Sequence, residues 1–180
     1  MSTSFRPLRP DPSEYPPYAQ QYVMQVTDGD LLAALDGQRD QLRTAAVPVS
    51  PDREHFAYAA GKWTMRQVVG HLGDAERVFS YRALCFARGD RTPLPGFDEN
   101  AYVDHARFND ARLSDLVEEL VLLRSANLKM LGALDEGQWS ATGTANGRAM
   151  SVRALAYVMT GHVRHHLMVL RDRYAVAVGV

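Results

Sequence analysis

The chain of 180 residues has very little cysteine, no long apolar run and almost no excess of either charge. Its single cysteine, Cys85, excludes an internal disulfide framework and is typical of proteins of a reducing cytoplasm. No stretch approaches the roughly eighteen consecutive apolar residues of a membrane span, and residues 1–6 lack the apolar segment of a secretory signal. The formal net charge of −1 argues against the basic surface of a nucleic-acid-binding protein. We therefore expect a cytoplasmic protein with neither a membrane nor a nucleic-acid partner.

Proline is concentrated near the N-terminus, where five of the nine prolines lie within residues 7–17. Proline removes a backbone donor and disfavours helix at the residue before it. Residues 1–22 are therefore expected to form an extended arm, which its tyrosines could attach to the body of the protein. The remainder, residues 23–180, is long enough for one domain with a substantial core.

Four later segments repeat their apolar residues with the period of an amphipathic helix. Thr27 is expected to cap the first helix, with Pro48 and Pro51 ending it, and Ser151 is expected to cap the fourth. We expect the four helices to span about residues 27–47, 64–88, 114–134 and 151–174.

The second of these helices has the clearest ends. Thr64 and Gln67 have the spacing of a capping box, and Trp63 just before them can act as a hydrophobic staple. Gly89 stands where a helix commonly terminates in the left-handed conformation. This helix is therefore predicted with well-defined boundaries.

Two long connections complete the pattern. Residues 90–110 are too many for a tight helix hairpin, so they predict a crossover along the bundle, with a short helix near residues 100–105. Residues 138–148 are rich in small polar and turn-forming residues, and no segment is a convincing strand. The fold class predicted is an all-α four-helix bundle with a long crossover between helices 2 and 3.

Histidines lie on two of the predicted helices. His162 and His166 are spaced i, i+4, which places them on one face one turn apart, and a helix wheel puts both within about 40° of the apolar direction. His165 lies about 100° from it and is expected to face solvent or a partner. His71, on the second helix, could supply a third nitrogen and complete a metal site.

Each of these histidines also has a simpler explanation. A lone histidine such as His71, about 80° from the centre of its apolar stripe, is more often a hydrogen-bonded flank residue than a ligand, and we expect it to face the core at most in part. Burying the pair His162 and His166 without partners would be costly, which favours a metal. Val163 stands where a zinc protease of the His-Glu-x-x-His type has its glutamate, so that general base is absent.

Several segments, taken in order, resemble the DinB-like superfamily of small bacterial helical proteins, which is distinct from the DNA polymerase sharing the DinB name. The resemblance covers about residues 27–175. The segments that carry it are Trp63-Thr64, His71-Leu72-Gly73-Asp74-Ala75-Glu76-Arg77, the stretch Ala87 to Asp98, Gly143-Thr144-Ala145-Asn146-Gly147, and Gly161-His162 with His165-His166.

The resemblance implies an up-down-down-up bundle, often a homodimer. It also implies a divalent metal, commonly zinc or nickel, held by three histidines that correspond here to His71, His162 and His166. Characterised relatives include S-transferases and isomerases that use low-molecular-weight thiols such as bacillithiol or mycothiol. Related loops often carry a histidine before Asn-Gly, whereas this chain has Ala145, so a role for a loop histidine is not supported.

Three protein ligands leave positions open for water or a thiolate, which is typical of a catalytic metal site. The leading hypothesis is a metal-dependent S-transferase or related hydrolase acting on a small electrophile. The alternative is a non-enzymatic metal-binding stress or regulatory protein. No catalytic or thiol-binding residue is assigned, although Thr144, Asn146 and Arg148 could line the mouth of the site.

Two further residues have both a functional and a structural interpretation. Asp74 could orient an imidazole, but an exposed i, i+3 pair with Arg77 is the better explanation. Cys85 could be a nucleophile, but no histidine is near it in sequence and a buried structural thiol is favoured.

Overall fold

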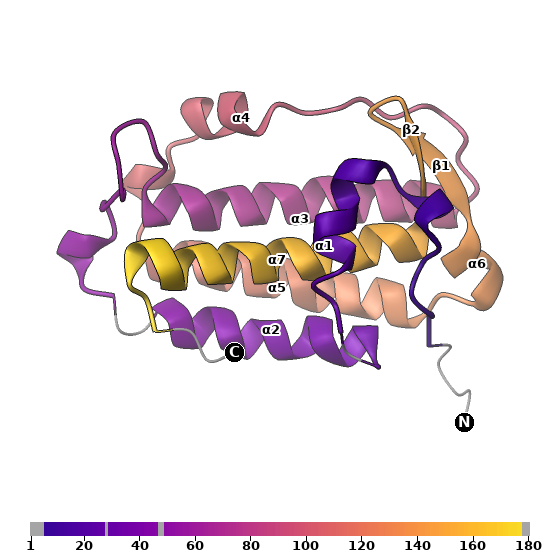
Figure 1. Cartoon of the computed structure of the whole chain (residues 1–180), viewed down its shortest axis with the longest axis horizontal. Helices are drawn as coiled ribbons and strands as arrows, with labels where there is room; N and C mark the ends of the chain where they lie inside the picture. The colour runs from indigo at the N-terminus through magenta and orange to yellow at the C-terminus, as the bar shows by residue number, and fades with distance from the viewer. Residues whose placement is uncertain (1–5, 28, 47–48, 178–180) are drawn as a thin grey trace.

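Four long helices lie side by side in the computed structural model, which describes residues 6–27, 29–46 and 49–177. They are α2 (Leu31–Ala46), α3 (Met65–Ala87), α5 (Leu113–Gly132) and α7 (Val152–Tyr174). Figure 1 shows that α2 and α7 run in one direction and α3 and α5 in the other. The arrangement is an up-down-down-up bundle, which confirms the predicted all-α fold. Within the described part of the chain, no helix is both long and apolar enough to cross a membrane.

The crossover between α3 and α5 returns along the outside of the bundle (Figure 1). Gly89 ends α3 with a φ of 77°, in the left-handed region that glycine adopts without strain. The chain then passes through α4 (Glu99–His105), capped by the Asp98 carboxylate, and the 3₁₀ turn η4 (Phe108–Asp110). The long connection and its short helix are thus confirmed, and the crossover is what allows α3 and α5 to run parallel.

The helix starts agree with the sequence at two places and differ at one. Thr64 and Gln67 form the predicted capping box of α3, and Ser151 caps α7 by accepting a hydrogen bond from the Ala154 amide. The predicted start of α2 was wrong, because the helix begins at Leu31. Its first turn is capped by Asp30, and not by Thr27: the Asp30 side chain accepts a hydrogen bond from the Ala33 amide. Asp30 directly precedes the first apolar residue and is the stronger cap.

The connection that follows α2 lies partly outside the described residues. Pro48, predicted to end the first long helix, lies there, whereas Pro51 begins the 3₁₀ turn η3 (Pro51–Arg53) beyond α2. Proline suits this first position because its missing amide proton would be unpaired there anyway.

A small hairpin follows α5, where only turns were predicted. After the short helix α6 (Glu136–Ser140), strands β1 (Thr142–Ala145) and β2 (Arg148–Ser151) pair antiparallel around Asn146 and Gly147. Both turn residues have positive φ, as a two-residue Asn-Gly hairpin turn requires. Strands of four residues are too short to show a clear alternating pattern, which is why the sequence did not reveal them.

The hairpin is tied to the crossover by Leu94. The Leu94 amide donates to the Thr144 carbonyl at 2.9 Å, and the Asn146 amide donates to the Leu94 carbonyl at 3.0 Å. These two hydrogen bonds place the start of the crossover beside the tip of the hairpin.

The N-terminal segment is folded rather than extended over residues 12–23. It forms two 3₁₀ turns, η1 (Pro12–Glu14) and η2 (Pro17–Ala19), and the one-turn helix α1 (Gln20–Val23). Prolines occupy the first positions of both turns, where their fixed φ suits a helical turn. Ala19 and Val23 are fully buried, and α1 packs on α7. The prediction of an extended arm therefore missed that proline can begin short helices as well as prevent long ones.

Gly161 of α7 makes this packing possible, and its replacement is expected to be destabilising. A Cβ at Gly161 would overlap the backbone carbonyl of Tyr22, so Gly161→Ala should displace α1 and lower the free energy of unfolding by about 1–3 kcal/mol. Gly37→Ala in α2, which meets no atom within 4 Å, is the matched control and should be neutral or stabilising by up to about 1 kcal/mol. Urea denaturation of both variants measures the difference; equal effects would show that α1 does not pack closely on α7.

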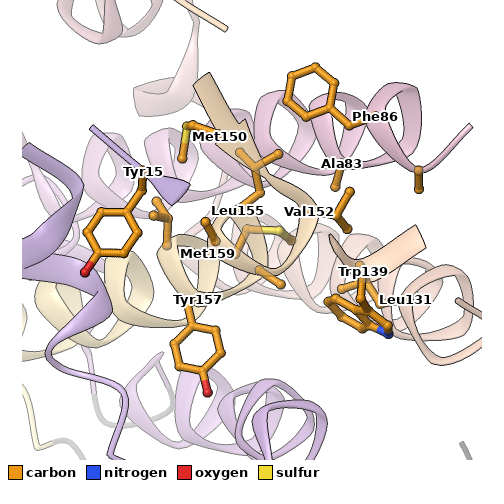
Figure 2. Packing of buried hydrophobic residues seen from close by; sticks show 14 of the residues in the cluster. Tyr15, Ala83, Phe86, Leu131, Trp139, Met150, Val152, Leu155, Tyr157 and Met159 are labelled. Carbon is orange, nitrogen blue, oxygen red and sulfur yellow. The ribbon is translucent and has the colours of Figure 1, made fainter. Parts of the chain in front are cut away.

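Two apolar clusters fill the bundle, one at each end. The first cluster lies at the hairpin end, where Trp139 and Phe86 are its largest fully buried side chains (Figure 2). The second includes Leu72 of α3, Leu120 of α5 and Leu167 of α7. The apolar stripes predicted for these helices supply both clusters.

A layer of polar side chains separates the two clusters, and each long helix supplies one member. The members of this polar layer are Gln38, Glu76, Arg124 and Thr160. Arg124 makes two bonds of 2.8 Å to the carboxylate of Glu76 and one of 2.6 Å to the Gln38 side-chain oxygen. The Gln38 amide donates to the Thr160 carbonyl at 2.8 Å. The buried charges are therefore paired and hydrogen-bonded, as burial requires.

Candidate metal centre

Three histidines from two neighbouring antiparallel helices meet beside the polar layer. His71 comes from α3, and His162 and His166 come from successive turns of α7. Nε2 of His162 lies 3.1 Å from Nε2 of His71 and 3.1 Å from Nε2 of His166. One nitrogen from each ring can be chosen so that all three lie within 4.8 Å of one another. The structure thus brings together the three histidines singled out from the sequence, with His162 at the centre.

His71 is more deeply buried than the sequence indicated. Its side chain is 5% exposed, although its helical phase predicted at most partial burial. The Trp63 ring covers it from outside the helix, with ring centroids 4.8 Å apart. The helix wheel considers only the apolar stripe of one helix and cannot include a residue that precedes that helix, which explains the error.

Burial keeps all three imidazoles neutral. Removal from water lowers the pKa of His71 to about 4 and that of His166 to about 3. The pKa of His162 is well below its ordinary value, first because of burial and then because His166 and His71 lie beside it. Neutral imidazoles have free ring nitrogens, which is the form that binds a metal.

The spacing of these nitrogens suits a single cation. Two nitrogens bound to one ion at about 2.1 Å lie about 3.0 Å apart at a right angle and about 3.4 Å apart at a tetrahedral angle. The two contacts of 3.1 Å fall between these values. Nε2 of His162 holds at most one proton, so ordinary hydrogen bonds cannot satisfy both contacts well. One cation bound to three lone pairs would satisfy both, and the residues therefore fit a metal.

His165 stays outside this cluster, but it does not simply face solvent. It is half-buried, and its ring packs edge-on against Tyr22 at 5.8 Å and against His166 at 5.1 Å. The Tyr22 ring also stands edge-on to His162 at 5.3 Å. Nδ1 of His166 is buried and has no hydrogen-bond partner among the described residues, so contacts of the ring and of Nε2, and not of Nδ1, orient that imidazole.

The histidines form one end of a cavity of about 340 Å³. Glu99 of α4 contributes to its wall, and its negative charge acts on His71 and Tyr22. Of the three loop residues that could have lined the site, Asn146 at the hairpin tip lines the cavity, whereas Thr144 and Arg148 are not among its described lining residues. The described side chains that line it are Tyr18, Tyr22, Trp63, His71, Ala75, Phe79, Arg82, Phe97, Glu99, Asn146, His162, His165 and His166.

Comparison with known proteins assigns the family. A family model described as the DinB superfamily matches residues 34–170, which is most of the chain. The chain belongs to the DinB superfamily. The resemblance stated from the sequence is thereby confirmed. All three histidines of the cluster, His71, His162 and His166, lie within the matched range.

Relatives of this DinB-superfamily chain include bacterial proteins named, by inference, as metal-dependent hydrolases. One from Geobacillus thermodenitrificans is 28% identical over 174 residues, covering 91% of this chain and 96% of that protein. Another, from Bacillus licheniformis, is 30% identical over 134 residues, covering 70% of this chain and 73% of that protein. These names describe the relatives.

A solved structure shows the same fold. YfiT from Bacillus subtilis, described by inference as a metal-dependent hydrolase with an unusual four-helix bundle topology, superposes with a TM-score of 0.71. The match covers 94% of this DinB-superfamily chain and 95% of YfiT at 18% sequence identity. At that identity the likeness establishes the up-down-down-up bundle and carries no further assignment.

Two other residues considered from the sequence lie away from the cluster in this DinB-superfamily protein. Asp74 pairs with Arg77 at 4.0 Å, the i, i+3 pair that was the favoured interpretation. Cys85 is a buried free thiol within the apolar cluster at the hairpin end. Neither lines the cavity.

Sequence reasoning missed two charged residues of the cavity wall, Arg82 and Glu99. Arg82 lies eleven positions after His71, which at about 100° per residue places it on the same face of α3, so helical phase could have identified it. Glu99 reaches the cavity only because the crossover folds back over the bundle, and no local pattern in the sequence signals that contact.

Proposed function

We propose that this protein is a metal-dependent enzyme that activates a low-molecular-weight thiol, or water, for attack on a small electrophile. The observation that carries the proposal is the convergence of three neutral imidazoles at one end of a cavity. A structural zinc site is closed by four protein ligands, whereas three ligands beside a cavity leave room for a reactant. The names of the relatives as metal-dependent hydrolases support a metal-dependent reaction.

His71, His162 and His166 would hold the ion through their ring nitrogens. A divalent cation there would act as a Lewis acid and lower the pKa of a thiol or water molecule that reaches it. Zinc and nickel are the proposed ions, although neutral imidazoles also accept iron and cobalt, and supply in the cell decides among them. Trp63, Tyr22 and Phe79 surround the histidines and exclude bulk water from that end of the cavity.

Glu99 is the proposed proton acceptor. Its carboxylate lines the cavity and is close enough to the histidines to affect the pKa of His71. In the transfer reaction, the thiol sulfur forms a bond to the electrophilic carbon, and the leaving group departs with the electrons of the bond that breaks. The thiol proton passes to Glu99 and from there to solvent, so that the reaction needs no oxidant or reductant.

The proposal is tested by conjugation of chlorodinitrobenzene with bacillithiol, mycothiol or glutathione. We expect turnover with at least one thiol that is lost after chelation and restored by zinc or nickel, with release of one chloride for each thioether formed. Protein made without a nickel column is used, so that its metal content reflects its own affinity. Stoichiometric metal without turnover toward any thiol or toward activated esters would contradict the enzyme and leave the metal-binding stress or regulatory role.

A further inference from the structure

Arg82 is a buried cation that has no anionic partner among the residues the structure describes. Its side chain is 4% exposed, and it donates one hydrogen bond of 2.7 Å to the Pro95 carbonyl. The Phe97 ring covers the guanidinium, with its centroid 5.9 Å from Cζ. Among the described residues, no carboxylate lies within 4.0 Å of this guanidinium. The charge is therefore held by one carbonyl and one aromatic face.

Arg124 is a buried arginine of the same bundle whose role is structural, and it has a carboxylate partner. It is fully buried, and the carboxylate of Glu76 accepts two parallel hydrogen bonds from it. A buried charge left without such a partner is costly. Burial also lowers the pKa of Arg82, which reflects the same cost. Unlike Arg124, however, Arg82 lines the cavity, so its missing partner can come from a bound molecule.

The position of Arg82 relative to the histidines sets the size of such a molecule. Arg82 lies eleven positions after His71 on α3, about 16 Å along the helix axis, and both residues line the same cavity. The Glu99 carboxylate acts on His71 at the histidine end of the cavity, whereas Arg82 lies beneath the Phe97 ring and donates a hydrogen bond to the Pro95 carbonyl. The cavity thus carries a negative side chain toward its histidine end and a positive one toward the hairpin end.

We propose that Arg82 binds a carboxylate of the substrate, so that the cavity accepts an elongated anionic molecule whose reacting group lies at the histidines. This inference rests on the proposed function only in placing the reacting group of the molecule at the histidines. A planar carboxylate matches the fork of N–H groups that Arg82 does not use on Pro95. Phe97 packs over the guanidinium, and Leu94, three residues before it, is hydrogen-bonded to the hairpin.

The test uses the full chain with cobalt bound and a series of mercapto acids, from mercaptopropionate to mercaptoundecanoate, each compared with the alcohol of equal length. Binding is followed by the thiolate–cobalt absorption band. We expect the longer acids to bind about 10- to 100-fold more tightly than their alcohols, because only they can reach both ends of the cavity. Arg82→Gln should abolish this preference without changing the affinity for the alcohols.

Arg77→Gln is the matched control, since Arg77 lies on the same helix and pairs with Glu119 at the surface. It should keep the preference for acids. Equal affinities of acid and alcohol in the wild type, or a preference that survives Arg82→Gln, would overturn the proposal. Arg82→Met provides a second variant: because the uncompensated charge is removed, its melting temperature should be unchanged or higher, which also shows that the chain is folded.

Calorimetry on chelator-treated protein separates this inference from the proposed function. Without metal, the thiol group of the ligand has no ion to bind and adds no affinity. The longer acids should still bind more tightly than the alcohols, and Arg82→Gln should still remove this difference in affinity. If His162→Ala loses the cobalt band and keeps the preference for acids, the carboxylate site stands on its own. If the band persists while the preference is absent, the metal site stands and the role of Arg82 is refuted.

Discussion

Replacing His162 with alanine is expected to abolish stoichiometric metal binding. Its Nε2 is the central atom of the cluster, 3.1 Å from the nitrogens of both His71 and His166. Removing a group that merely orients a metal ligand reduces affinity by about 10- to 100-fold, so loss of the central ligand should cost more than about 100-fold. Elemental analysis of protein produced without nickel chromatography measures the effect, and metal-dependent turnover should disappear in parallel.

Two other histidines serve as controls for this experiment. His165 is adjacent in sequence to His166 but outside the cluster, and His105 is exposed on α4. His165→Ala and His105→Ala are both expected to retain one equivalent of metal. A wild-type protein without stoichiometric metal, or a His162→Ala variant that binds it as well as the wild type does, would refute the three-histidine site. Circular dichroism of each variant establishes that loss of metal is not loss of fold.

Replacing Arg124 with methionine is expected to destabilise the fold by about 3–5 kcal/mol. The substitution would leave the Glu76 carboxylate buried with the Asn127 amide as its remaining described partner, at 2.9 Å. It would also remove the donor to the Gln38 side-chain oxygen. Because a domain of this size is stable by about 5–15 kcal/mol in total, the loss should be evident as a lower midpoint of urea denaturation.

A double replacement distinguishes an unpaired charge from a simple packing defect. Combining Arg124→Met with Glu76→Leu removes both charges, and its stability should lie well above that of the single Arg124→Met variant. Arg112→Ala, which breaks the exposed pair with Asp115, provides the comparison and should cost less than about 1 kcal/mol. If Arg124→Met costs no more than Arg112→Ala does, the polar layer is not important for stability.

The sequence predicted the long helices well because their signals are local. Thr64 and Ser151 lie at the helix starts, Gly89 follows the end of α3, and apolar residues repeat at the helical period within each segment. The features missed depend on a few residues or on tertiary contacts. The hairpin rests on Asn146 and Gly147 with strands of four residues, and α1 is stable only because it packs on α7 at Gly161.

The same distinction holds for the candidate site. His162 and His166 could be paired from their spacing, because both lie on one helix and face one direction. His71 required the family resemblance, since its covering residue, Trp63, precedes the helix. Glu99 could not be found, because the crossover that carries it folds back over the histidines only in three dimensions.

The polar layer has a consequence for how an ion would enter and leave the protein. Thr160 of the layer lies two residues before His162, and Glu76 lies five residues after His71, so the layer sets the relative heights of α3 and α7 where the histidines lie. Sliding α3 by a turn would separate the buried Glu76 carboxylate from Arg124, and sliding α7 would separate the Thr160 carbonyl from the Gln38 amide. The three nitrogens are therefore brought together by folding itself, before any ion arrives. Such a preformed site permits exchange of one divalent ion for another on a chain that stays folded throughout.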